Sequence, residues 1–251
     1  MIDTEYLISI VLSALAVLIT LPIHELAHGY IAYKLGDPTA KNLGRLTLNP
    51  IKHLDPVGAI CLVFLRFGWA KPVPIDPRNL KNPKRDFALV ALAGPVINVI
   101  IAFLSLPIWL LVRNLYVATY LNGAFLTRFL MLSLNFLSAF HYINLGLAIF
   151  NLLPIPPLDG SRILCALLPD KANVWVYRHE RNIYIALLVW LIGGSFVSNA
   201  LLSMPIVAAN PVFSSLATYI SLSNILGSLS SLISDAMFSF WELIPLFRLN
   251  F

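Results

Sequence analysis

The chain has 251 residues, of which 59% are hydrophobic and only 12% are charged. Soluble domains carry roughly 25% charged residues, so this composition excludes an ordinary soluble domain and predicts an all-α polytopic membrane protein. The net charge of +5 would indicate nucleic-acid binding in a soluble chain, but in a membrane protein lysine and arginine first report topology. Cys61 and Cys165 have no CxxC spacing, so neither a disulfide framework nor a cysteine zinc site is expected.

Four segments reach the roughly 20 apolar residues that a helix needs to cross the hydrocarbon core. We expect spans over residues 7–32, 87–112, 129–153 and 183–209. The N-terminus lacks the basic region and cleavage site of a signal peptide, because its first charges are Asp3 and Glu5. The first span is therefore expected to be retained, and residues 1–210 are expected to form one membrane core.

The stretch DPVGAICLVFLRFGWAKPVPIDP lies between the first two spans. Its apolar part is too short to cross the membrane and contains Arg66. Because Gly68, Pro72 and Pro74 interrupt it, the pattern favours a re-entrant β-hairpin over residues 57–75 rather than a helix. An interfacial loop is the alternative.

Residues 211–251 follow the last predicted span and are expected to form a C-terminal amphipathic helix and a tail. Apolar residues recur at helical spacing over residues 212–241, opposite a face rich in serine. Three arrangements remain open: a helix in the membrane interface, a packed span, or an oligomer contact. The apolar positions are Phe213, Leu216, Ile220, Leu226, Leu229, Ile233 and Met237.

Orientation follows from the basic residues. Fourteen of the seventeen lysines and arginines fall in residues 34–85 and 162–181, and the others are Arg113, Arg128 and Arg248. The positive-inside rule therefore predicts a multi-pass protein of the cell membrane, with its N-terminus outside and both basic regions in the cytoplasm. Because topology accounts for these charges, a nucleic-acid partner is not expected.

The motif HELAH places ionisable side chains in the first span. His24 and His28 are four residues apart, so on a helix their imidazoles project from one face and can bind one Zn²⁺. Glu25 lies beside them, where a carboxylate can accept a proton from water activated by the metal. Ionisable groups inside a membrane are costly and usually mark function. Polar residues at a helix end, satisfied by lipid headgroups, are the structural alternative.

A catalytic zinc site needs a third protein ligand. The strongest candidate is Asp159, which follows the third span on the same side of the membrane as the end of the first span. The prolines of NLLPIPPLDG forbid a regular helix there, and irregular backbone at membrane depth lines a cavity or is buried in protein. His53, His141 and His179 are the alternatives, with His53 the main rival and His141 more consistent with a hydrogen-bonded core residue.

With these motifs, the sequence resembles the site-2 protease family of zinc intramembrane metalloproteases. The resemblance rests on HELAH, on ALAGPVINV and on NLLPIPPLDG, which together cover the three core helices. The stretches KLGDPTAKNLGRLTLNPIKHLDPVG and GWAKPVP resemble the small bacterial and archaeal branch. No segment is long enough for the PDZ or CBS domains of other members, so regulation by such modules is not expected.

The resemblance implies one zinc ion per chain, held by His24, His28 and Asp159, with Glu25 as general base. It also implies that Asn151 steadies the substrate carbonyl or the oxyanion. The expected reaction is hydrolysis of peptide bonds in or near transmembrane segments of other membrane proteins within the lipid bilayer. A metal-ion or small-solute transporter is the alternative function, and an inactive scaffold is a third.

Gly94 and Asn98 lie four residues apart in the second span. We assign both a structural role: the glycine permits close helix packing, and the asparagine forms a hydrogen bond across helices.

Overall fold

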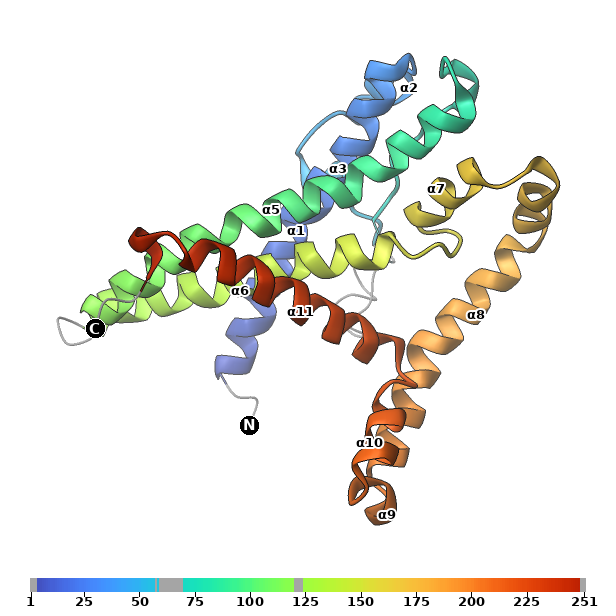
Figure 1. The fold of residues 1–251 in the computed structure, drawn as a ribbon. Helices are drawn as coiled ribbons and strands as arrows, with labels where there is room; N and C mark the ends of the chain where they lie inside the picture. The colour runs from blue at the N-terminus through green and yellow to red at the C-terminus, as the bar shows by residue number, and fades with distance from the viewer. Residues whose placement is uncertain (1–3, 57, 59–69, 120–123, 249–251) are drawn as a thin grey trace.

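The computed structural model describes residues 4–56, 58, 70–119 and 124–248, and the regular secondary structure of these residues is helical (Figure 1). The elements in chain order are α1 (Thr4–Leu35), α2 (Thr39–Asn42), α3 (Pro50–His53), η1 (Pro77–Asn79), α5 (Pro83–Thr119), α6 (Ala124–Asn151), α7 (Asp159–Leu167), α8 (Asp170–Leu202), α9 (Pro205–Ala208), α10 (Pro211–Thr218), α11 (Leu222–Glu242) and η2 (Pro245–Phe247).

Four of these helices, α1, α5, α6 and α8, are long and apolar enough to span a membrane, which confirms the predicted number of spans. All four helices begin before their predicted first residues, because a helix can include polar turns that precede its apolar stretch, whereas α6 and α8 end before their predicted last residues. The largest difference is in α8, which was predicted over residues 183–209 but begins at Asp170 and ends at Leu202. Its first turns carry charged residues that an apolar scan does not count.

The predicted β-hairpin over residues 57–75 lies largely outside the described residues. In its described part no strand is present: Leu54 and Ala70 form one isolated antiparallel bridge, and residues 71–76 lie outside any helix or strand. Proline has no N–H to donate to a ladder, so Pro72 and Pro74 are consistent with this irregular backbone. A β-hairpin is therefore not supported by the residues that the structure describes.

The prediction of one continuous C-terminal helix is wrong, because α10 and α11 meet at a bend of 98°. Helix α8 approaches this break closely, and the indole of Trp190 donates a hydrogen bond to the carbonyl oxygen of Ile220 at 3.0 Å. Helix α11 then packs against α5 and α6 (Figure 1). Its apolar face covers a buried core cluster, so this face of α11 packs against the protein's own helices. The contacting residues are Leu226, Ile233 and Met237 on α11, and Ala102, Leu145 and Ile149 beneath them.

Buried polar contacts tie the central helices together. Asn144 on α6 donates a hydrogen bond to the Thr20 hydroxyl on α1 at 2.9 Å. His141 on α6 contacts the Ala102 carbonyl oxygen through Nδ1 and the Ser234 hydroxyl through Nε2, each at 2.9 Å. Because buried polar groups are costly unless paired, these bonds fix the register of α1, α5, α6 and α11. The interpretation of His141 as a hydrogen-bonded core residue is confirmed.

The segments that follow α1 and precede α5 and α8 gather at one end of the molecule (Figure 1). Lys84 at the start of α5 donates a hydrogen bond to the Leu168 carbonyl oxygen at 2.7 Å, so the two basic regions of the sequence meet. At the same end, the buried carboxylate of Asp37 accepts hydrogen bonds from the Asp76 backbone N–H at 2.8 Å and the Asn79 amide at 2.9 Å. This carboxylate fastens the chain before α5 to the end of α1.

Candidate metal centre

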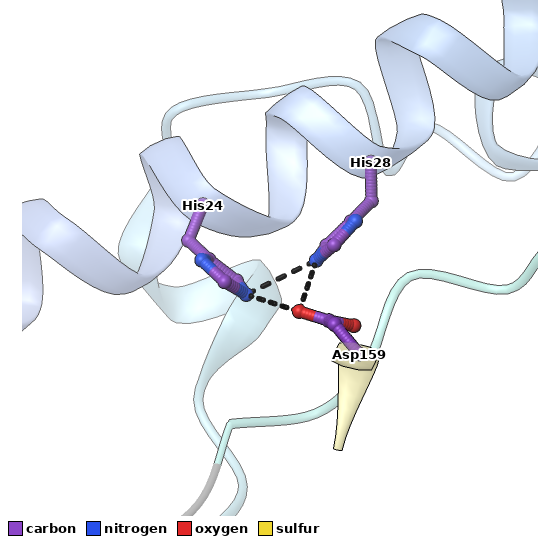
Figure 2. Close-up of side chains that lie close together, drawn as sticks. All are labelled: His24, His28 and Asp159. Carbon is purple, nitrogen blue, oxygen red and sulfur yellow. Dashed lines mark hydrogen bonds and ion pairs between the residues drawn. The ribbon is translucent and has the colours of Figure 1, made fainter. Parts of the chain in front are cut away.

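His24, His28 and Asp159 converge at one point between α1 and the start of α7 (Figure 2). The two Nε2 atoms are 3.0 Å apart, and Asp159 Oδ2 lies 3.3 Å from His24 Nε2 and 3.2 Å from His28 Nε2. Both histidines are buried. The structure therefore brings together the three side chains that the sequence proposed as ligands, from positions 131 residues apart in the chain.

The histidine side chains are oriented by helix α5. The Val90 carbonyl oxygen lies 2.7 Å from His28 Nδ1, so Nδ1 donates this hydrogen bond and Nε2 faces Asp159. Such a hydrogen bond on the second ring nitrogen is the usual way in which proteins fix a metal-binding imidazole. His24 Nδ1 is buried and has no partner among the described residues.

Asp159 is placed by the proline-rich turn that ends α6. The helix stops at Asn151 and α7 begins eight residues later at Asp159, because the prolines between them cannot continue a regular helix. At Gly160, an added Cβ would lie 2.5 Å from the Leu153 carbonyl oxygen, so only glycine lets α7 start this close to the turn. Burial opposes ionisation of Asp159, but the neighbouring His24 and His28 outweigh it and lower its pKa to about 2. The carboxyl group is therefore ionised at neutral pH.

The geometry and the donor types together fit a zinc ion. Two imidazole nitrogens and a carboxylate oxygen form a common catalytic zinc ligand set. Ligands about 2 Å from a tetrahedral ion are separated by roughly 3.3 Å, and the three atoms are 3.0 to 3.3 Å apart. In addition, Asp159 Oδ2 is buried without a well-oriented hydrogen bond from any described residue, which leaves its lone pairs available to a cation.

Gly94 has a role that the sequence analysis missed. An added Cβ there would lie 2.5 Å from His24 Cε1 and 2.6 Å from His28 Cε1, and closer still to His28 Nε2. The glycine thus makes room for both imidazoles, whereas we had assigned it only to helix packing. The spacing from Gly94 to Asn98 was visible in sequence, but nothing there showed which helix face the histidines would meet. The expected hydrogen bond of Asn98 across helices is absent: the amide is buried, with no partner among the described residues.

We call His24, His28 and Asp159, the candidate metal ligands, the ligand group. Glu25 follows His24 in α1 and is half-buried. Its Oε2 accepts a hydrogen bond from the Val73 backbone N–H at 2.8 Å. We call residues 70–76, which run past Glu25 in the segment preceding α5, the strap. In sequence, most of the strap fell in the predicted β-hairpin and in the GWAKPVP resemblance, and neither predicted its contact with the Glu25 carboxylate.

The other candidate residues lie outside the ligand group. His53 is buried, and its Nε2 contacts the Thr47 carbonyl oxygen at 2.8 Å. His179 is half-buried, with its Nδ1 2.8 Å from the Trp175 carbonyl oxygen. The Asn151 amide donates to the Leu147 carbonyl oxygen of its own helix at 3.0 Å. The structure brings none of these three side chains to the ligand group, and an oxyanion role for Asn151 stays a prediction.

A helical membrane protein in which two histidines one turn apart and a carboxylate could hold a metal ion, with a glutamate next to them in sequence, has the features of a zinc metalloprotease. Residues 12–193 match the family described as Peptidase family M50, and the chain belongs to this family. The resemblance to site-2 proteases is confirmed.

Three relatives illustrate the range of similarity. The protein named "Putative zinc metalloprotease YwhC" of Bacillus subtilis is 43% identical over 185 residues, which cover 73% of this chain and 82% of that protein. "Putative zinc metalloprotease Rip2" of Mycobacterium tuberculosis (strain Erdman) is 28% identical over 70% of this chain and 68% of its own length. "Zinc metalloprotease MJ0392" of Methanocaldococcus jannaschii is 29% identical over 61% of this chain and 33% of its own length. No solved structure gave a significant match.

Proposed function

We propose that this metalloprotease is an intramembrane endopeptidase that cleaves peptide bonds in or near the transmembrane segments of other membrane proteins. The observation that carries the proposal is the position of HELAH. His24, Glu25 and His28 lie within α1, a helix long and apolar enough to span the membrane. A substrate that reaches these residues must approach from the bilayer or from its cytoplasmic boundary.

In the proposed mechanism, His24, His28 and Asp159 hold the zinc ion. When bound, zinc acts as a Lewis acid that acidifies water and polarises the scissile carbonyl group. Glu25 accepts a proton from the attacking water and transfers it to the departing amine. The position of Glu25 on the same helix as both histidines, next to His24, supports this role.

The test of this function is cleavage of single-span peptides by the purified protein in detergent. We expect cleavage within or next to the apolar segment, loss of cleavage after a zinc chelator, and recovery when zinc is restored. Mass spectrometry of the products locates the cut. Cleavage confined to soluble peptides would contradict the intramembrane assignment. Zinc-dependent solute flux in vesicles, with no proteolysis, would instead support the transporter that the sequence left as an alternative.

We also propose that the metal centre faces the cytoplasm. The two basic regions meet at the end of the molecule where α1 ends, as the contact between Lys84 at the start of α5 and Leu168 directly after α7 illustrates. Excess lysine and arginine mark cytoplasmic segments. We therefore expect reporters fused at the N-terminus or at residue 120 to read outside, and reporters at Lys81 or Lys171 to read inside. A cytoplasmic signal at residue 120 would refute this orientation.

A further inference from the structure

The strap is held in place by one buried arginine. Arg45 Nη2 donates hydrogen bonds to the Lys71 carbonyl oxygen at 2.8 Å and to the Pro72 carbonyl oxygen at 3.2 Å. The next residue, Val73, donates its backbone N–H to Glu25 Oε2 at 2.8 Å. Arg45 is thus connected to the glutamate through two consecutive peptide units.

The burial of Arg45 requires an explanation. Its side chain is 9% exposed, and among the described residues it forms no ion pair with a carboxylate. Its Nε atom is also buried without a partner there. A buried charge that is paired only with carbonyl groups is costly, and a neutral side chain could fill the same space at lower cost. The contacts of Arg45 therefore indicate a task other than stability.

The strap also packs on the catalytic face of α1. Val73 is 6% exposed, and an added Cβ on Gly29 would lie 3.0 Å from its Cγ1. Gly29 follows Glu25 by one helical turn, so the side chain of Val73 meets α1 directly after the point where its N–H meets Glu25. Further along the strap, the Asp76 N–H is fixed by Asp37 at 2.8 Å. Small displacements of the strap would consequently move the donor that holds Glu25.

We propose that Arg45 is a positioning residue for Glu25. By holding the carbonyl groups of Lys71 and Pro72, it keeps the Val73 N–H on one carboxylate oxygen of Glu25 and leaves the other oxygen directed to the attacking water. The proposal rests on the proposed role of Glu25 as general base. Arg45 contacts neither the ligand group nor, in this scheme, the substrate, so its removal affects the rate of the chemical step.

The test compares Arg45→Met, Arg45→Lys and Arg78→Met. In Arg45→Met we expect kcat to fall about 10²-fold, since misplacing a catalytic group by about 1 Å has this effect, while bound zinc and KM stay unchanged. Arg45→Lys should recover part of kcat, because an ammonium group still donates to a carbonyl oxygen. Arg78→Met removes the same charge near the strap. Its side chain is 89% exposed and pairs with Asp76, so we expect parent kinetics.

Val73→Pro keeps the test decisive if Arg45→Met does not fold, and a labelling measurement reports the position of the strap without relying on enzymatic activity. Val73→Pro removes the N–H that donates to Glu25, together with the side chain that packs near Gly29. We expect the same fall in kcat with zinc retained. Val73→Ala, which shortens the side chain but keeps the N–H, is its control and should retain the parent kcat. In metal-free protein with Cys61 and Cys165 replaced by serine, a Val73→Cys thiol should be protected from alkylation. Adding Arg45→Met should raise its labelling rate about tenfold, independently of enzymatic activity.

The proposal would be overturned if Arg45→Met or Val73→Pro kept the kcat of the parent protein. It would also be overturned if Arg45→Met left the labelling rate of the Val73→Cys thiol unchanged. Loss of zinc in parallel with kcat would also overturn it, since Arg45 would then support the metal centre rather than the base. A rise in KM without a fall in kcat would contradict the positioning role. Undiminished cleavage by Glu25→Gln would instead refute the proposed mechanism, and the labelling result would still show whether Arg45 holds the strap.

Discussion

Glu25→Gln is expected to retain one zinc ion per chain, while its cleavage rate falls about 10²- to 10⁴-fold, the usual contribution of general acid–base catalysis. Its amide cannot accept the proton from water, yet all three ligands stay in place. His24→Ala, His28→Ala and Asp159→Ala should instead lose zinc and cleavage together. The separation follows from the structure, in which Glu25 contacts Val73 while the other three side chains converge on one point.

Zinc content and turnover measured on the same preparations test this separation. His179→Ala is the matched control, because this half-buried histidine lies outside the ligand group; it should behave like the parent protein. Stoichiometric zinc in Asp159→Ala, with loss only in His53→Ala, would transfer the third ligand to His53. Loss of zinc in Glu25→Gln would show that the glutamate is a ligand rather than the base.

Gly94→Ala is expected to empty the metal centre although it adds only one methyl group. That group would lie 2.5 Å from His24 Cε1 and 2.6 Å from His28 Cε1, well inside van der Waals contact. The imidazoles are buried between α1 and α5 and cannot move aside without losing their geometry. We expect zinc occupancy to fall below half and cleavage to fall more than about 10²-fold.

The control for this substitution is Gly146→Ala on α6. An added Cβ there meets nothing within 4 Å, and alanine stabilises a helix relative to glycine by about 0.5 to 1 kcal/mol. Zinc content and cleavage should therefore remain at the parent level, with an equal or higher thermal midpoint. Full zinc occupancy in Gly94→Ala would show that α5 can shift away from α1 to accommodate the methyl group, and would refute the tight packing of Gly94 against the histidines.

The sequence alone determined the features that depend on local patterns. Apolar length predicted four spans because the hydrocarbon core admits only helices of sufficient length. The four-residue spacing of His24 and His28 predicted a shared helix face, since that relation holds within any helix. The prolines before Asp159 predicted the end of α6, because proline cannot continue a helix there.

Only the tertiary structure decided which distant segments meet. The apolar spacing of residues 212–241 is the same whether the helix is straight or broken, so the 98° bend and the packing of α11 were not predictable from it. Gly94 faces both histidines because of the rotation of α5 about its own axis relative to α1, which the sequence does not show. Likewise, Arg45, Val73 and Glu25 come from three separate segments, and no periodicity links them. Their contacts arise from the folding of the connecting chain over the end of α1, a long-range arrangement that local sequence patterns do not encode.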